Sequence, residues 1–223
     1  MAAFHLLKKI DANQLSKLID SFQKEHVNVN YQPSRHLLEF SEGEELSVRL
    51  PFFIKYEHHK IIPSNFLIVL IHSGEAALAY SEEDQITEHK MVKAYMVRQK
   101  QGKSQIKHLK TKGKSKAGSR VRLAGTDHFF EEINEKISEW NEYYDIDKIA
   151  ISCNKTLQPY FFNRSDAALK KDDNRIIKIP KHIQEANFEN LTSIHKYLIS
   201  TELNFENSEK DFIKELVLNI TNE

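Results

Sequence analysis

The sequence of 223 residues has very few of the features that mark secreted or membrane-spanning proteins. It contains one cysteine, Cys153, which excludes an internal disulfide and a cysteine-rich zinc site. No apolar run reaches the roughly 18 to 20 residues that a membrane-spanning helix needs. The first residues, MAAFHLLKKIDANQ, do not show the basic segment, apolar segment and cleavage site of a signal peptide. We therefore expect a cytoplasmic protein with no membrane partner.

Net charge is absent as well, because 32 Lys and Arg balance 32 Asp and Glu. The balance is not uniform along the chain. The 38 residues between Glu88 and Asp127 contain no acid and twelve bases, so the other 185 residues carry 20 bases against 32 acids. Nucleic acid repels an acidic body and attracts a cationic segment, so we expect the protein to approach RNA through this segment.

Glycine and bulky apolar residues are also distributed unevenly. Four of the six glycines lie at positions 102, 113, 118 and 125. From Lys100 to Ser119 the bulky apolar side chains are Ile106 and Leu109 alone, so this stretch buries too little surface to offset its ordering entropy. The sequence predicts a long mobile basic loop over residues 100–125, mounted on a folded scaffold.

Apolar patterns on both sides of the loop predict that scaffold. Asp127 is expected to cap an amphipathic helix of about five turns, whose apolar residues recur at three- and four-residue spacing. The other expected elements are strands at 66–71, 75–80, 90–98, 148–153 and 175–179, and helices at 156–163, 188–201 and 208–219. Alternating strands and helices predict an α/β domain with a mixed sheet flanked by helices.

The first 60 residues are expected to form a small extension on the α/β domain of residues 61–223. Asp11 can cap a helix, and the segments 37–40 and 46–50, joined by SEGEE, predict a hairpin.

The basic loop does not contain the common phosphate-binding or hydrolytic motifs. GKS occurs at 102–104 and 113–115, but a P-loop needs a glycine five residues earlier, where the sequence has Val97 and His108. The loop also has no carboxylate for general-base work and no Ser-His-acid set. Since few of its side chains can stack on bases, we expect phosphate contacts with structured RNA rather than base readout.

Residues 94–122, AYMVRQKQGKSQIKHLKTKGKSKAGSRVR, carry the motifs of a known family. Val97-Arg98 ends a strand, Lys100-Gln101-Gly102 and Ser104-Gln105 follow it, and Ala117-Gly118-Ser119-Arg120 precedes a helix with FFEEINEKISEW. This region resembles the catalytic loop of the Vms-like release-factor family, whose relatives include Pelota and the central domain of eukaryotic peptide-chain release factors. The resemblance is specific over about residues 66–155 and continues more weakly to the C-terminus.

The resemblance implies a ribonuclease-H-like fold and metal-independent release of nascent chains from stalled large ribosomal subunits, without a cofactor. Its implied partners are ribosomal RNA of the large subunit and peptidyl-tRNA, with the protein a monomer off the ribosome. Gln105 maps onto the family's functional glutamine, which positions water at the peptidyl-tRNA ester, and Gly102, Ser104 and Gly118 set the loop geometry. The cations that we expect to contact RNA are Arg98, Lys100, Lys103, Lys107, Lys110, Lys112, Lys114, Lys116, Arg120 and Arg122.

One residue departs from the family pattern. Lys103 stands where release factors and their Vms relatives have the first glycine of a Gly-Gly-Gln or Gly-Ser-Gln tripeptide. A positive φ suits glycine and strains lysine, so hydrolysis is slowed or lost if the active loop needs that conformation. The alternatives left open are a non-catalytic ribosome- or RNA-binding module, cleavage of the tRNA 3′ end, and a ribonuclease-H-type nuclease with clustered carboxylates.

Overall fold

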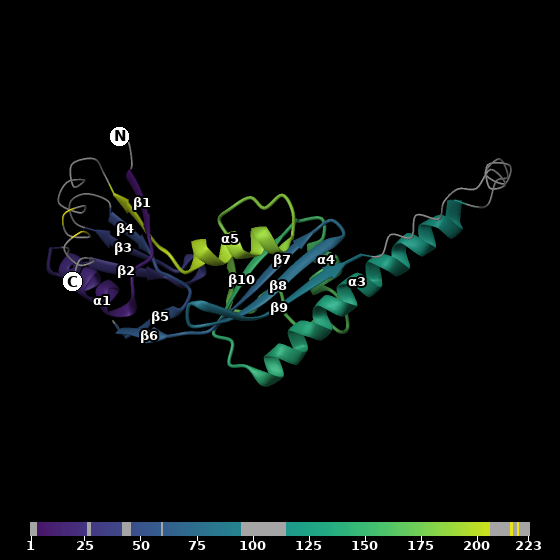
Figure 1. Cartoon of the computed structure of the whole chain (residues 1–223), viewed down its shortest axis with the longest axis horizontal. Helices are drawn as coiled ribbons and strands as arrows, with labels where there is room; N and C mark the ends of the chain where they lie inside the picture. Colours follow the sequence, from purple (N-terminus) through teal and green to yellow (C-terminus); the bar gives the residue numbers. More distant parts are fainter. Residues whose placement is uncertain are drawn as a thin grey trace.

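A computed structural model describes residues 4–25, 28–41, 46–58, 60–94 and 115–205, together with Glu215 and Leu218. These residues form an α/β structure with two five-stranded sheets, one two-stranded sheet and four α-helices (Figure 1). Within them, no helix combines the length and the apolar character that crossing a membrane requires.

The first sheet is antiparallel throughout, in the order β1-β12-β4-β3-β2. Its strands are β1 (Phe4–Lys8), β2 (Asn28–Gln32), β3 (Leu37–Ser41), β4 (Leu46–Arg49) and β12 (Thr201–Phe205). The predicted hairpin is confirmed by the pairing of β3 with β4. A 3-10 turn (Pro33–Arg35) lies between β2 and β3. Strands β5 (Ile54–Glu57) and β6 (Lys60–Pro63) form the separate two-stranded sheet.

Helix α1 (Ala12–Glu25) covers the first sheet with the buried side chains Leu15, Leu18, Ile19 and Phe22. The predicted cap at Asp11 is confirmed. Its Oδ1 accepts from the Gln14 N–H at 2.8 Å, and the Gln14 Oε1 accepts from the Asp11 N–H at 3.2 Å. Such a reciprocal pair satisfies two amide donors that have no partner inside the helix.

Strand β12 was not predicted from the sequence. A helix was expected to run to residue 201, but α5 (Phe188–Leu198) ends earlier, and Thr201, Leu203 and Phe205 are buried at every second position. This two-residue period is that of a strand, which pairs with both β1 and β4. The first sheet is therefore built from both ends of the described chain, and the division at residue 60 stays a prediction.

The second sheet holds the expected scaffold, in the order β11-β10-β7-β8-β9. The strands are β7 (Phe66–His72), β8 (Glu75–Glu82), β9 (Gln85–Lys93), β10 (Lys148–Cys153) and β11 (Ile176–Lys178). β7, β8 and β9 form an antiparallel meander, while β10 pairs in parallel with both β7 and β11. Four of the five strands were predicted at these places.

The fifth strand, β9, starts five residues earlier than the predicted segment 90–98. The turn that sets its start contains Glu83 with φ of 52°, a left-handed position that closes the β8–β9 hairpin. The first residues of β9 alternate between exposed and half-buried, so they lack the apolar run that marked the other strands. Residues 95–98 of the predicted strand lie outside the described residues.

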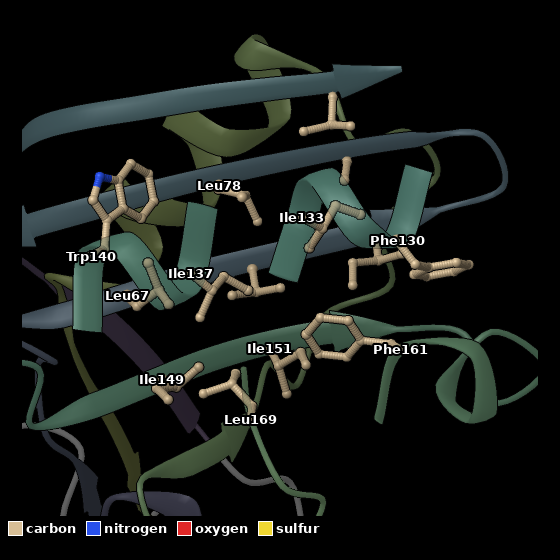
Figure 2. Packing of buried hydrophobic residues seen from close by; sticks show 14 of the residues in the cluster. Leu67, Leu78, Phe130, Ile133, Ile137, Trp140, Ile149, Ile151, Phe161 and Leu169 are labelled. Atoms are coloured by element: carbon tan, nitrogen blue, oxygen red, sulfur yellow. The ribbon is translucent and has the colours of Figure 1, made fainter. Parts of the chain in front are cut away.

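Helices cover both faces of the second sheet, which explains the continuous apolar run of β7. Leu67, Val69 and Ile71 face α3 (Ser115–Tyr143) and α4 (Gln158–Phe162), as Figure 2 shows for Leu67. Phe66, Ile68 and Leu70 belong to the opposite core, together with α5. The short helix predicted at 156–163 is confirmed as α4. The helix predicted at 208–219 lies outside the described residues apart from Glu215 and Leu218.

The start of α3 differs from the prediction. A loop was expected through residue 125, with Asp127 as the cap of the helix, but the helix begins twelve residues earlier at Ser115. Residues 115–126, SKAGSRVRLAGT, contain no proline and several good helix formers, and extending an existing helix costs less than nucleating one. Asp127 lies inside the helix, with its Oδ1 3.6 Å from Nη1 of Arg164. Figure 1 shows the first part of α3 projecting beyond the sheet.

Arg49 links the first sheet to the end of α5. Its Nε donates to Glu202 Oε2 at 2.8 Å, and its Nη2 donates to the backbone oxygens of Tyr197 and Ser200 at 3.1 and 3.0 Å. The guanidinium also lies 4.2 Å from the centre of the Tyr197 ring. The exposed fractions of the Arg49 and Glu202 side chains are 7% and 16%, so this ion pair is shielded from solvent.

We predict that Arg49→Ala lowers the free energy of unfolding by about 3 to 5 kcal/mol, because the half-buried Glu202 carboxylate loses its cationic partner and two backbone carbonyls lose their donor. Urea denaturation followed by circular dichroism measures this change. Lys60→Ala, which removes an exposed cation from β6, is the control and should shift the free energy by less than about 0.5 kcal/mol. An equal loss in the free energy of unfolding for the two substitutions would contradict the stabilising role given to Arg49.

Candidate functional site

The predicted active segment, residues 95–114, lies between β9 and α3 in the chain. The described chain leaves β9 at Lys93 and Ala94, where the Ala94 N–H donates to the Gly74 oxygen at 2.9 Å. Gly74 has φ of 80°, so the β7–β8 turn beside this exit needs glycine. The description resumes at Ser115, the first residue of α3.

Most of the predicted site lies in the interval between these two anchors. Gln105, Gly102 and Ser104 are outside the described residues, as are the cations Arg98, Lys100, Lys103, Lys107, Lys110, Lys112 and Lys114. Lys116, Gly118, Arg120 and Arg122 lie in the first turns of α3, where the backbone is described. The roles of all these residues remain predictions. The structure defines the strand β9 and the helix α3 that flank the active segment.

The second half of α3 is packed firmly on the sheet. Its inward side chains are less than 5% exposed and contact Leu67, Leu78, Ile149, Ile151 and the α4 residue Phe161 (Figure 2). Those inward side chains are Phe129, Phe130, Ile133, Ile137 and Trp140. Burying each of them contributes roughly 1.5 to 3 kcal/mol, so this half of the helix is fixed relative to the sheet.

A polar cluster joins the same half of α3 to β9, and we call it the Glu88 clamp (Glu88, Lys136, Trp140 and Tyr144). The Glu88 carboxylate accepts from Trp140 Nε1 at 2.7 Å and from the Tyr144 hydroxyl. Lys136 Nζ lies 3.9 Å from the same carboxylate. A second pair, Lys90 Nζ to Glu132 Oε1 at 2.9 Å, ties the two elements together further along.

The clamp keeps Glu88 ionised. Hydrogen bonds from Tyr144 and then Trp140 hold the pKa of Glu88 below its usual value, with Lys136 adding to the effect. The same bond to Glu88 raises the pKa of Tyr144 to about 12, so the hydroxyl stays a donor at neutral pH. The Tyr144 ring also stacks on Tyr80 of β8 at 4.1 Å between centroids.

The sequence patterns did not reveal the clamp. Trp140 is 1% exposed. A buried indole N–H needs an acceptor, and this rule could have directed attention to Glu88, the last acid before the basic segment.

The single cysteine and the adjacent histidines His58 and His59 are further candidates for a reactive thiol and for metal ligands. Burial raises the pKa of the Cys153 thiol to about 11, which favours an inert thiol over a nucleophile. His58 adopts φ of 50° in a turn, and its neighbour His59 lies outside the described residues. Among the residues that the structure describes, no three of His, Cys, Asp and Glu lie together as metal ligands would.

Comparison with known proteins identifies the family. A family model described as "Bacteroidetes VLRF1 release factor" matches residues 66–206. The chain belongs to this release-factor family. The match begins at β7, ends just after β12 and includes the predicted active segment, so the resemblance found at residues 66–155 is confirmed and extends further along the chain.

Matches outside the family model are few. No curated protein matches the chain. Among solved structures, the chain is similar to the "Vms1 mitochondrial localization core", with 13% identity and a TM-score of 0.45. The alignment covers 86% of this chain and 82% of that one.

We predict that the stabilising effect of the Glu88 clamp is lost in acid. A group whose pKa is lowered on folding stabilises the fold above its unfolded pKa, and this contribution fades as pH falls through the folded pKa. Wild type should therefore be more stable than Glu88→Gln at pH 7, and the difference should shrink steadily below about pH 4.5.

Denaturation of both proteins at pH 7, 5 and 3 measures the effect. Glu142→Gln, at an acid of the same helix outside the clamp, is the control and should show no such pH-dependent difference. A difference between wild type and Glu88→Gln that stays constant with pH would contradict the role given to the carboxylate.

Proposed function

We propose that this release-factor family member is a peptidyl-tRNA hydrolase, which frees nascent chains from stalled large ribosomal subunits. The observation that carries the proposal is the family match over residues 66–206, because it includes the segment Lys103-Ser104-Gln105. The segment lies between β9, a strand of the second sheet, and α3, whose second half packs on that sheet, and this supports the proposal.

Gln105 is the proposed catalytic residue. Its side-chain amide offers both a carbonyl acceptor and two N–H donors, so it can orient a water molecule and stabilise oxyanion charge without titrating. The water adds to the ester carbonyl, the tRNA 3′ oxygen leaves with a proton, and the peptide is released as a carboxylic acid. Positioning inside an RNA active site supplies much of the rate, which requires no metal ion or cofactor.

The basic segment is the proposed contact with ribosomal RNA and peptidyl-tRNA. This segment carries twelve bases and no acid, whereas the rest of the chain is acidic. The electrostatic field of the whole protein therefore favours approach to RNA by this segment. Lys103 fits the same role. A lysine at positive φ costs roughly 1 to 3 kcal/mol, and a phosphate contact can offset part of that cost.

We further propose that the second sheet is ribonuclease-H-like. Three antiparallel strands, β7 to β9, are followed by α3 and by two strands added in parallel on the other side of β7. This arrangement of a meander and two parallel strands, with helices on both faces, supports the assignment.

We predict that Gln105→Ala slows peptide release from stalled large-subunit complexes by roughly 100-fold or more, as loss of a positioned hydrogen-bonding group does in other acyl transfers. Release is measured as the loss of labelled peptidyl-tRNA on a gel. Gln99→Ala removes a glutamine of the same segment that lies outside the quoted motifs and is the matched control, with release expected close to wild type.

Equal release by wild type and Gln105→Ala would contradict the catalytic assignment. Two other outcomes identify the alternatives. Ribosome binding with no cleavage under any condition indicates a non-catalytic module, and a tRNA shortened at its 3′ end indicates cleavage of the nucleic acid instead of the ester.

We also predict that binding to large subunits weakens steeply with salt. If about five cations of the segment contact phosphates, the logarithm of the affinity falls with the logarithm of salt at a slope of roughly −3.5 to −4.5. Replacing Lys107 and Lys110 by Gln should reduce the magnitude of the slope by roughly 1.4 to 1.8. Affinity that does not depend on salt would contradict an RNA-binding role for the segment.

A further inference from the structure

A basic cleft of about 620 Å³ lies at the carboxyl ends of the parallel strands β7, β10 and β11. Its floor is apolar, with Ile151, Ile176, Ile179 and Phe162. Its titratable side chains, apart from Cys153, are all lysines or histidines, and no Asp or Glu lines it among the described residues. They are Lys155, Lys171, Lys178, Lys181, His72 and His182.

The active segment leaves the sheet at this same edge. β9 runs in the direction of β7, since each is antiparallel to β8. In the register of the sheet, His72 lies opposite Glu75, and Glu75 lies opposite Lys93, the last residue of β9. Neighbouring strands lie about 4.8 Å apart, so the end of β9 is within roughly 20 Å of the end of β11.

α4, which follows β10, marks this edge in Figure 1. The first part of α3 projects from the same end of the sheet. The cleft and both anchors of the active segment therefore share one side of the molecule.

Three of the lysines are available to a ligand. Lys155, Lys171 and Lys178 are exposed, and none of them forms an ion pair with a described carboxylate. Two acids of the neighbouring loops are already occupied, because Asp166 and Asp173 each lie 2.8 Å from an arginine, Arg164 and Arg175 respectively.

The other charged residues near the cleft leave its excess of positive charge unchanged. Lys181 is used within the fold, since its Nζ lies 3.8 Å from the centre of the Tyr197 ring. Asp172 is exposed beside Lys171 but does not line the cleft.

We propose that Lys155, Lys171 and Lys178 form a second phosphate-binding surface. This surface contacts the backbone of the tRNA whose 3′ end is the proposed target of the active segment. The proposal rests on the proposed function and adds a contact outside the basic segment. A nucleic-acid duplex carries about one phosphate charge per 1.7 Å of its axis, so an RNA helix lying along this edge presents phosphates to both sites at once.

The test compares two triple variants of the full chain with equal loss of charge. The first is Lys155→Gln/Lys171→Gln/Lys178→Gln. The matched control is Lys24→Gln/Lys60→Gln/Lys196→Gln, which removes three exposed lysines from α1, β6 and α5. Binding of labelled deacylated tRNA is measured between 50 and 200 mM salt, and circular dichroism confirms that each variant is folded.

The first variant should bind tRNA tens of times more weakly at 150 mM salt, and the magnitude of its salt slope should fall by roughly 2 to 3. The control variant should keep the wild-type slope. Equal losses in the two variants would overturn the proposal, because only net charge would then matter. Displacement of tRNA by millimolar inorganic phosphate at constant ionic strength would also overturn it, since it would indicate a site for a free anion.

Failure of this inference is distinguishable from failure of the proposed function. If Gln105→Ala abolishes release while the first triple variant binds tRNA like the control, the cleft is no RNA site and the catalytic assignment stands. If the triple variant loses affinity and the wild type releases no peptide, the RNA surface stands and the hydrolase assignment fails.

Discussion

The packing of α3 against β9 is the constraint on which the rest of this structure depends. The chain leaves the sheet after Lys93 and returns as α3, so everything between these points is held at two places. The apolar face of α3 and the hydrogen bond from Trp140 to Glu88 fix those places relative to each other. The proposed catalysis by positioning requires a fixed support of this kind.

Charge is arranged along α3 in the opposite sense to the helix dipole. Lys116, Arg120 and Arg122 lie in its first turns, while acids such as Glu131 and Glu135 come later. Cations near a helix N-terminus are unfavourable by roughly 0.3 to 1 kcal/mol each, so the fold gains no stability from them there. The proposed RNA partner would account for this placement, and also for a net charge of zero that is made of two opposed parts.

Sequence periodicity was sufficient for the elements that bury their side chains in a simple repeat. The apolar run of β7 and the three- and four-residue spacing of the inward face of α3 predicted both correctly. Periodicity failed where tertiary context decides. The start of α3 has no apolar face to mark it, and the alternation of β12 spans only five residues beside a predicted helix.

The proposed functional residues also divide into those that the sequence predicts and those that it does not. Gln105 was reached from a motif, whereas the three lysines of the cleft share no local pattern, because strands distant in sequence bring them together. A structure of this chain bound to a large subunit that carries peptidyl-tRNA tests the role of Gln105. If Gln105 positions the water, its amide lies within about 3 Å of a water molecule or oxygen at the peptidyl ester. A bound structure in which Gln105 lies away from the tRNA 3′ end would contradict it.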